Sequence, residues 1–309
     1  MAVGNLDGDS EDEIVTGAGP GGGPHVQVWN VGANGTITPG VGFMAYAPAF
    51  TGGVTVAVGD VNGDGKADII TGAGAGGGPH VRVFNQDGSL QNAGFMAYGP
   101  DFTGGVDVAA GNMDDDPAAE IITGAGAGGG PHVREFNVDA AGNGATPIGG
   151  GFMAYGPSFT GGVRVASGDF DSANNSTASE IVTGPGAGGG PHVRVFNADG
   201  SARGGGFMAY SPSFPGGVDV AVGNVVGTSS SAKDIITGAG PGGGPHVAVF
   251  SDTGSPLDGG YFAFESDFSG GVAVAAGNVQ TANNEFNGGE VIAGTYRSGS
   301  RVSGHRFNH

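Results

Sequence analysis

The chain has 309 residues, of which 70 are glycine and 17 proline, and its 29 acidic against 10 basic side chains give a formal net charge of −19. Nucleic acid and anionic lipid are poor partners for such a chain, because both are bound by clustered lysine and arginine. The lack of cysteine excludes disulfides and thiolate metal sites. No apolar run approaches the roughly 20 residues of a membrane helix, so we expect no membrane insertion.

One unit repeats along the whole chain. Gly-Gly-Val segments begin at residues 52, 104, 161, 216 and 270, so that successive units are 52 to 57 residues long. Near-identical Gly-rich segments that end in Gly-Gly-Gly-Pro-His-Val begin at Gly17, Gly72, Gly124, Gly184 and Gly238, and a degenerate sixth copy begins at Gly294. Because Met1 aligns with Val56, inside a strand, we expect the natural chain to begin earlier.

The second unit shows four short strands in chain order. Residues 52–60 alternate valine with smaller residues, residues 67–74 are rich in isoleucine, and residues 80–85 and 94–98 follow after turn sequences. Strands of five to seven residues with turns between them and no helical periodicity are typical of a propeller blade. A parallel β-helix has shorter rungs, and a disordered chain would not keep valine and phenylalanine in register.

The sequence therefore predicts an all-β fold, a single β-propeller domain over residues 1–309 with about six four-stranded blades. The fourth strand occurs only five times, four times as Gly-Phe-Met-Ala-Tyr and once as Gly-Tyr-Phe-Ala-Phe, so we expect the last blade to be incomplete. An exposed strand edge invites pairing, and the missing strand could come from beyond the chain ends or from self-association with another chain. The predicted blades are 1–51, 52–103, 104–160, 161–215, 216–269 and 270–309.

An acidic loop follows the first strand of the early units. In the second unit it has oxygen-bearing side chains at loop positions 1, 3, 5 and 9, namely Asp60, Asn62, Asp64 and Asp68. Calcium prefers six to eight oxygen ligands, which such a loop can direct to one centre. An EF-hand would need a glutamate at the position of Thr71 and flanking helices. Asp, Asn and Gly clusters are also ordinary turn formers, which is the alternative to a calcium site.

The same loop positions are acidic or amidic in three further units, and we expect three or four calcium sites. The candidate ligands are Asn5, Asp7, Asp9 and Glu13 in the first blade, Asn112, Asp114, Asp116 and Glu120 in the third, and Asp169, Asp171 and Glu180, with extra residues between them, in the fourth.

These features resemble the FG-GAP, or VCBS-like, repeats of integrin α-subunit propellers and of bacterial surface proteins. The resemblance rests on the Val-Ala-Val-Gly-Asp sequence at residues 56–60, the acidic loop and the Ile-Thr-Gly-Ala-Gly sequence at residues 70–74. It implies a propeller that binds calcium outside the cell or at its surface and acts in adhesion or recognition; some similar propellers are lectins. The repeated Gly-Gly-Gly-Pro-His segment departs from the integrin pattern.

Antiparallel strands place the Gly-Gly-Gly-Pro-His loops and the blade-to-blade connections at the end opposite the acidic loops. A uniform face of this kind suits equivalent ligand sites, with histidine as a hydrogen-bonding group and tyrosine as a stacking surface. Alternatively, the histidines cap their own loops. The candidate ligand-binding residues are His25, His80, His132, His192 and His246, with Tyr46, Tyr98, Tyr155 and Tyr210.

We expect a non-catalytic, multivalent recognition or adhesion module for glycans or other cell-surface ligands. The alternatives are a structural spacer or lattice element and a polysaccharide-active enzyme. The asymmetric residues that an enzyme would need are scattered, and the position after Gly-Gly-Val varies too much to indicate a joint role in the channel. These residues are Arg164, Arg203, Lys233, Arg297, Arg301, His305 and Arg306, and the varied position holds Thr55, Asp107, Arg164, Asp219 and Ala273. Trp29 takes the position that a packing phenylalanine holds in the other units, namely Phe84, Phe136, Phe196, Phe250 and Phe307.

Overall fold

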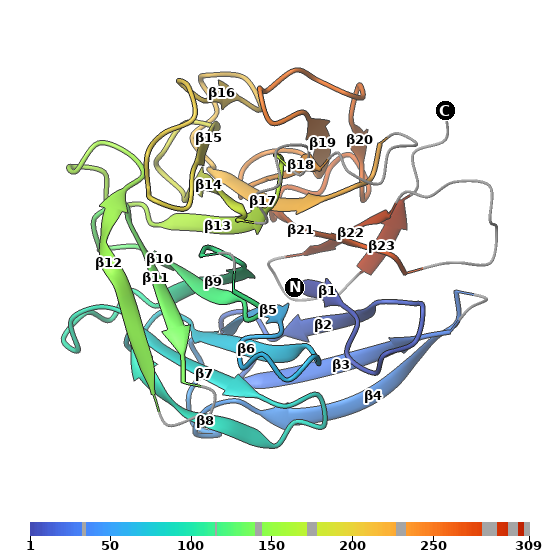
Figure 1. Cartoon of the computed structure of the whole chain (residues 1–309). Coiled ribbons are helices and arrows are strands. Elements are labelled where there is room, and N and C mark those ends of the chain that lie inside the picture. The colour runs from blue at the N-terminus through green and yellow to red at the C-terminus, as the bar shows by residue number, and fades with distance from the viewer. Residues whose placement is uncertain are drawn as a thin grey trace.

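The chain folds into a ring of six antiparallel β-sheets, five with four strands and the last with three (Figure 1). The computed structural model describes residues 1–32, 35–114, 116–139, 144–171, 178–226, 233–279, 289–295 and 302–305. Each sheet is built from consecutive strands, which is the arrangement of propeller blades. The prediction of an all-β propeller with an incomplete last blade is confirmed.

The blades share one strand order from the centre outward. The first strands are β1 (Ala2–Gly4), β5 (Val54–Gly59), β9 (Val106–Gly111), β13 (Val163–Gly168), β17 (Val218–Gly223) and β21 (Val272–Gly277). The second strands are β2 (Glu13–Gly17), β6 (Asp68–Ala73), β10 (Glu120–Ala125), β14 (Glu180–Pro185), β18 (Asp234–Ala239) and β22 (Glu290–Thr295). The third strands are β3 (His25–Val31), β7 (His80–Phe84), β11 (His132–Val138), β15 (His192–Phe196), β19 (His246–Phe250) and β23 (Val302–His305). The fourth strands are β4 (Ile37–Met44), β8 (Leu90–Met96), β12 (Ala145–Met153), β16 (Phe207–Met208) and β20 (Tyr261–Phe262).

The hydrophobic core lies between neighbouring blades. One cluster joins Ile70 and Val83 of the second blade to Val108 and Ile121 of the third. The second strands of blades 2 to 5 are buried along their length, since each is covered on both faces by adjacent sheets. Such strands show no alternation between buried and exposed residues. Blade-to-blade packing, rather than packing inside a blade, holds the ring together.

The ring closes by contact between the first and last blades. Strand β1 contacts β21 on one side and β5 on the other, and Ile14 packs in one cluster with Val279 and Ile292. The Asp12 amide donates to the Asn278 carbonyl at 2.6 Å, and the Asn278 amide donates to the Asp12 carboxylate at 2.7 Å. Closure is thus achieved although the last blade has three strands.

The packing position at the end of the third strand is confirmed for Trp29 and corrected for the last blade. Trp29 lies opposite Ile14, as Phe84 lies opposite Ile69. In the last blade it is His305 that lies opposite Val291, and the ring of Tyr261 stacks on it at 4.0 Å. Because the sixth repeat is degenerate, the predicted position, Phe307, is two residues beyond the position that the structure shows. Phe307 itself lies outside the described residues.

The two ends of the ring carry different loops, as predicted. We call the end with the loops between first and second strands the acidic end, and the opposite end the glycine end. At the acidic end neighbouring loops are bonded, with the Ala119 amide donating to the Asp60 carbonyl at 2.7 Å. At the glycine end the Gly76 amide of a Gly-Gly-Gly-Pro-His loop donates to the Thr103 carbonyl of a blade connection at 2.8 Å. Across the described residues, no helix has the length and apolar character needed to cross a membrane.

Candidate functional site

The acidic loop of the first blade gathers three carboxylates at one point. One oxygen each from Asp7, Asp9 and Glu13 lies within 4.8 Å of the others. The Asp9 amide donates to Asp7 Oδ1 at 3.0 Å, which curls the loop. Glu13 begins β2 and is only 1% exposed; its Oε2 accepts from the Leu6 amide at 2.8 Å, whereas its buried Oε1 has no hydrogen-bond partner.

The third blade repeats this arrangement with Asp114, Asp116 and Glu120, again within 4.8 Å. Glu120 is 0% exposed, its Oε2 accepts from the Met113 amide at 2.5 Å, and its buried Oε1 has no partner. Burial, together with the charges of Asp114 and Asp116, raises the pKa of Glu120 to about 7. The pKa of Glu13 is raised for the same reasons, burial first and then the charges of Asp7 and Asp9.

These two clusters fit a hard cation. A buried carboxylate oxygen without a partner costs free energy, and an oxygen-seeking ion such as calcium would satisfy it while cancelling the repulsion between the three acids. The predicted asparagine ligands are used inside their loops: Asn5 Oδ1 accepts from the Gly8 amide at 2.7 Å, and the Asn112 side-chain amide donates to the Asp116 carbonyl.

Blade 3 also contains an acid that the sequence analysis did not single out. Glu135 on β11 is 5% exposed, and burial and the charge of Glu120 raise its pKa to about 7. The signal was present in the sequence, because the equivalent positions in the other complete blades hold Val28, Val83, Val195 and Val249. An acid at a core position next to an acidic loop indicates a polar or ionic neighbour.

The second blade has the loop with the most regular spacing, and the side-chain oxygens of that loop accept hydrogen bonds from within the protein. Asp60 accepts from the amides of Gly63 and Gly65, both at 2.8 Å, and Asn62 Oδ1 accepts from the Asp64 amide at 2.8 Å. Asp68 accepts from the Val61 amide and, at 2.8 Å, from the Gln91 side chain. Over the described residues, groups of three carboxylates within 4.8 Å occur only in blades 1 and 3.

In the fourth blade an arginine occupies the middle of the acidic loop. Arg203 donates to Asp171 at 2.8 Å and to Glu180 at 2.5 Å, and lies 3.7 Å from Asp252 of the next blade. Asp169 Oδ1 accepts from the Asp171 amide at 2.7 Å. A guanidinium in this place supplies the positive charge and the hydrogen bonds that an ion would otherwise supply.

Comparison with known families identifies the repeat. Residues 52–91, which contain strands β5, β6 and β7 and the acidic loop of blade 2, match the family model described as FG-GAP repeat. The same strand–loop–strand unit recurs in the other blades of the ring. The chain is an FG-GAP-like β-propeller.

A search of curated proteins gave no match for this FG-GAP-like propeller. Solved structures with a related arrangement include the exotype rhamnogalacturonan lyase YesX (14% identity, TM-score 0.44, 95% of this chain and 52% of that one). They also include the Bacillus licheniformis rhamnogalacturonan lyase PL11 (16%, 0.44, 98% and 56%) and the rhamnogalacturonan lyase YesW (13%, 0.43, 96% and 56%). The chain thus spans about half the length of these proteins.

The tyrosines of the FG-GAP-like propeller connect neighbouring blades. The Tyr46 hydroxyl, on blade 1, donates to the carbonyls of Thr71 and His80 of blade 2 at 3.0 and 2.8 Å. Burial raises the pKa of this phenol above its usual range. Bonds to the histidine carbonyl of the following blade recur at Tyr98, Tyr155 and Tyr210. Their hydroxyls therefore connect neighbouring blades of the propeller. Only the edges of their aromatic side chains would be left for ligand binding.

The predicted histidines lie half-buried at the glycine end, and four of them lie beside these tyrosines, namely His80, His132, His192 and His246. The rings of Tyr46 and His80 are 5.6 Å apart. His132 Nε2 is 3.1 Å from the Gly150 carbonyl, and His192 Nε2 is 2.9 Å from that of Gly205. Burial lowers the pKa of His80, His132 and His246. A neutral imidazole that faces a carbonyl donates from Nε2, which leaves Nδ1 as an acceptor.

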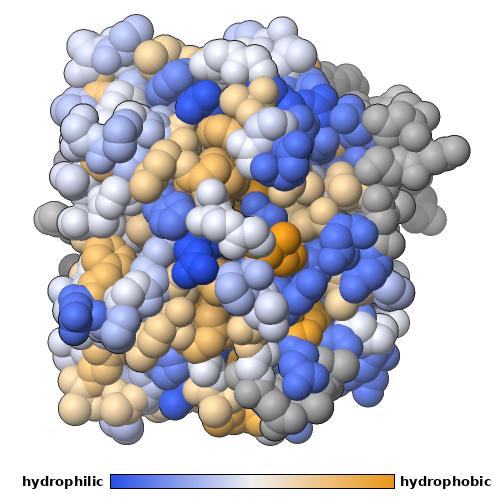
Figure 2. All heavy atoms as spheres, turned by 60° about the vertical axis from the view of Figure 1, so that its left-hand side comes forward, coloured by the Kyte–Doolittle hydropathy of each residue, from blue (hydrophilic) through white to orange (hydrophobic). Residues whose placement is uncertain are grey.

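An exposed apolar side chain accompanies each of these histidines. Met44 pairs across the strands with His25, and the equivalent partners of the other four histidines are Met96, Met153, Met208 and Phe262. All five side chains are about half exposed, between 48% and 57%. On the flank shown in Figure 2, hydrophobic patches alternate with hydrophilic ones. The propeller thus presents five similar imidazole–apolar pairs on its outer strands.

The central channel holds an ion-pair triad, so the prediction of no joint role there was wrong. Arg164 lies 3.5 Å from Asp107 and 3.9 Å from Asp219. These side chains come from β13, β9 and β17, which are consecutive around the axis. The remaining oxygens of the two acids accept from the amides of Val165 and Val274 of the following blades. Sequence variation at this position hid the complementarity of the charges.

The other basic candidates lie apart from this triad. Arg203 is at the acidic end, Lys233 precedes β18 and His305 ends β23, whereas Arg297, Arg301 and Arg306 lie outside the described residues.

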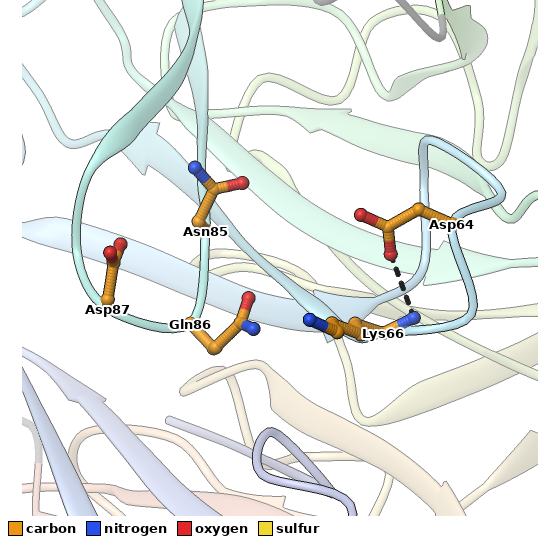
Figure 3. A pocket seen from close by; sticks show the side chains of 5 residues that line it. All are labelled: Asp64, Lys66, Asn85, Gln86 and Asp87. Carbon is orange, nitrogen blue, oxygen red and sulfur yellow. Dashed lines mark hydrogen bonds between the residues drawn. The ribbon is translucent and has the colours of Figure 1, made fainter.

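A hollow of about 240 Å³ at the acidic end is lined by Asp64 and Lys66 of the β5–β6 loop and by Asn85, Gln86 and Asp87 of the β7–β8 turn (Figure 3). It shows that both kinds of turn share this end.

Proposed function

We propose that this FG-GAP-like propeller is a non-catalytic recognition module, stabilised by calcium and working outside the cell or at its surface. The observation that carries the calcium part is the pair of buried, unpartnered carboxylate oxygens, Glu13 Oε1 and Glu120 Oε1. Each lies in a cluster with two exposed aspartates. Calcium would complete these sites, and blade 2 would bind it more weakly because its oxygens already accept hydrogen bonds.

The acidic loops also bear on the compartment. Two exposed aspartates and one buried glutamate leave most of the coordination shell to backbone and water oxygens. Sites of this kind bind calcium with dissociation constants on the order of 10⁻⁴ to 10⁻³ M, as in extracellular modules. Such sites fill outside the cell, where calcium is abundant, and this supports an extracellular or cell-surface setting.

The recognition surface is formed by the five imidazole–apolar pairs of the outer strands. A half-exposed apolar side chain next to an imidazole acceptor combines a packing surface with a hydrogen-bonding group, which is what the C–H face and the hydroxyls of a sugar require. Similar pairs in five blades favour weak sites that gain strength through multivalency. A set of equivalent groups suits repeated binding of glycans better than a unique catalytic centre.

Calcium binding is tested by a matched pair of variants. Glu120→Gln should remove one bound ion, lower calcium affinity in blade 3 by at least ~10-fold and reduce the rise of Tm on adding calcium. Glu180→Gln, at the same position of blade 4, should leave the number of bound ions unchanged, because Arg203 occupies that loop. The measurements are isothermal titration with calcium and melting with and without a chelator. Equal ion counts in both variants, or a chelator-insensitive Tm, would contradict the proposal.

Glycan recognition is tested separately with the calcium-loaded protein on a glycan array. The expected result is binding that falls when Met96 and Met153 are both changed to Ser, with Leu90→Ser as an exposed apolar control outside the pairs. A flat response to all glycans would refute the ligand class without touching the calcium sites.

A further inference from the structure

Each fourth strand fits into the next blade through a repeated set of contacts. The strand's phenylalanine packs on the aromatic residue that ends the next third strand, as Phe43 does on Phe84 with ring centroids 4.6 Å apart. Its tyrosine donates to the next second and third strands, as Tyr46 does to Thr71 and His80. Phenylalanine pairs recur at the three following junctions, so a fourth strand belongs as much to the next blade as to its own.

In the described part of the chain, the junction from the last blade to the first lacks this strand. Over the described residues, the sheet of blade 6 ends at β23, so no fourth strand covers the third strand of blade 1. Thr16 there is partly exposed, whereas its counterparts Thr71, Thr123, Thr183 and Thr237 are all 0% exposed. Trp29 is also only half-buried, while Phe84, Phe136, Phe196 and Phe250 are 2% to 6% exposed.

The side chains of blade 1 make local bonds in place of those that a fourth strand would accept. Arg82 of blade 2 donates to the Ala45 carbonyl of the preceding fourth strand at 2.9 Å. Its counterpart Gln27 instead donates within its own sheet, to the carbonyls of Val28 and Gly40 at 2.7 and 3.0 Å. Trp29 Nε1 donates to Thr16 Oγ1 at 3.1 Å. This surface of blade 1 therefore has polar side chains at the positions that contact a fourth strand in the other blades, but here they form hydrogen bonds within blade 1.

The residue types specify which strand fits. Tyrosine in the fourth strand is matched by threonine in the next second strand at four junctions. At the fifth junction the tyrosine is replaced by Phe264, which has no hydroxyl, and the threonine by Ala293. Thr16 therefore indicates a tyrosine, and Trp29 indicates a phenylalanine, in the incoming strand.

We propose that the edge of β23 and the adjoining surface of blade 1, formed by Thr16, His25 and Trp29, bind an extended segment of the type Gly-Phe-x-Ala-Tyr. Strand addition would give it backbone bonds along β23 and side-chain contacts on blade 1. The five segments of this kind within residues 1–309, four with the sequence Gly-Phe-Met-Ala-Tyr and one with Gly-Tyr-Phe-Ala-Phe, already form β4, β8, β12, β16 and β20 or continue from them. A folded second copy has none to give, so the segment comes from outside these residues.

The test uses a synthetic peptide with the sequence of residues 93–103, and Trp29 as the reporter, since it is the only tryptophan of the chain and the peptide has none. We expect a saturable change in Trp29 fluorescence at one peptide per chain, and slower hydrogen exchange of the amides of residues 302–305. A peptide with Tyr changed to Phe should bind ~5- to 10-fold more weakly, because one hydrogen bond to a partly buried partner is lost.

Matched controls separate this site from non-specific binding. Thr16→Ala should weaken the normal peptide by a similar factor and leave the Tyr-to-Phe peptide unaffected, whereas a scrambled peptide should not bind. Equal binding of the scrambled peptide, or no exchange protection of β23 at millimolar peptide, would refute the proposal. A concentration-dependent dimer that buries Trp29 without peptide would also refute it, since the occupant would then be a second copy. None of these outcomes depends on calcium.

Discussion

Blades 3 and 4 differ in how the charge of a buried glutamate and its neighbouring aspartates is compensated. Each has a buried glutamate at the start of its second strand, Glu120 or Glu180, facing aspartates of the preceding loop. In blade 4 the guanidinium of Arg203 binds both Asp171 and Glu180. In blade 3 the buried Oε1 of Glu120 has no hydrogen-bond partner. The comparison suggests that an acidic loop in this fold is completed either by the chain itself or by a cation.

The blades with and without an internal donor to the last acid of the loop differ in the hairpin between the third and fourth strands. Arg203 of blade 4 and Gln91 of blade 2 occupy the same position, seven residues after Phe196 and Phe84, and both donate to the last acid of their loop. In these blades the third strand has five residues, whereas β3 and β11 have seven. In the two blades with the longer third strands, Glu13 Oε1 and Glu120 Oε1 have no hydrogen-bond partner.

The largest expected effect comes from removing the internal cation of blade 4. Arg203→Met would leave Asp171 and Glu180 without their counter-charge, and we expect a loss of ~2–3 kcal/mol of unfolding free energy in chelator, less than for a fully buried pair because Arg203 is partly exposed. Calcium should restore part of this loss, and titration calorimetry should count one more ion than in the unmodified chain.

Lys66→Met is the control for that experiment, since it removes one positive charge from an exposed position at the same end. It should change neither stability by more than ~0.5 kcal/mol nor the ion count. If Arg203→Met left stability and ion count unchanged, the guanidinium would not replace a bound cation in blade 4, and the proposed equivalence between blades 3 and 4 would be wrong.

A smaller effect is expected from pH. The pKa is raised by burial to about 7 for Glu120 and Glu135 and to about 6 for Asp68, above the values of 4.5 and 3.8 expected when unfolded. The folded chain then holds protons that the unfolded chain releases. In chelator this contribution is complete below about pH 4 and is lost as pH rises through about 7, amounting to ~1–3 kcal/mol.

Calcium should flatten this pH dependence, because a bound cation favours the charged carboxylates. Urea unfolding at pH 5 and at pH 7.5, with calcium and with chelator, measures it. Glu120→Gln should reduce the slope seen in chelator. A slope that is the same with calcium and with chelator would mean that these carboxyls do not face the ion.

Much of this architecture was predictable because it follows from a repeated local pattern. Four strands, their order and the two ends come from alternation and turn residues, and Trp29 was correctly placed by its position in the repeat. What could not be predicted depends on contacts between blades. The Asp107–Arg164–Asp219 triad and the partner of Glu180 join residues that are far apart in sequence, and the blade 2 loop has ideal spacing although its oxygens accept hydrogen bonds within the protein.

The smallest and most selective change converts blade 2 into the type of blade 4. Gln91 already donates to Asp68 at 2.8 Å, so Gln91→Arg would place a guanidinium next to Asp68 and Asp64. We expect a stability change within ~1 kcal/mol in chelator, because one donor replaces another in a partly exposed loop. In calcium, the weakest bound ion should be lost, because the arginine competes for the same carboxylates. Gln91→Leu leaves Asp68 Oδ1 without a donor and should instead increase the calcium affinity of blade 2. If the calcium titrations of the two variants coincided, residue 91 would not control ion binding.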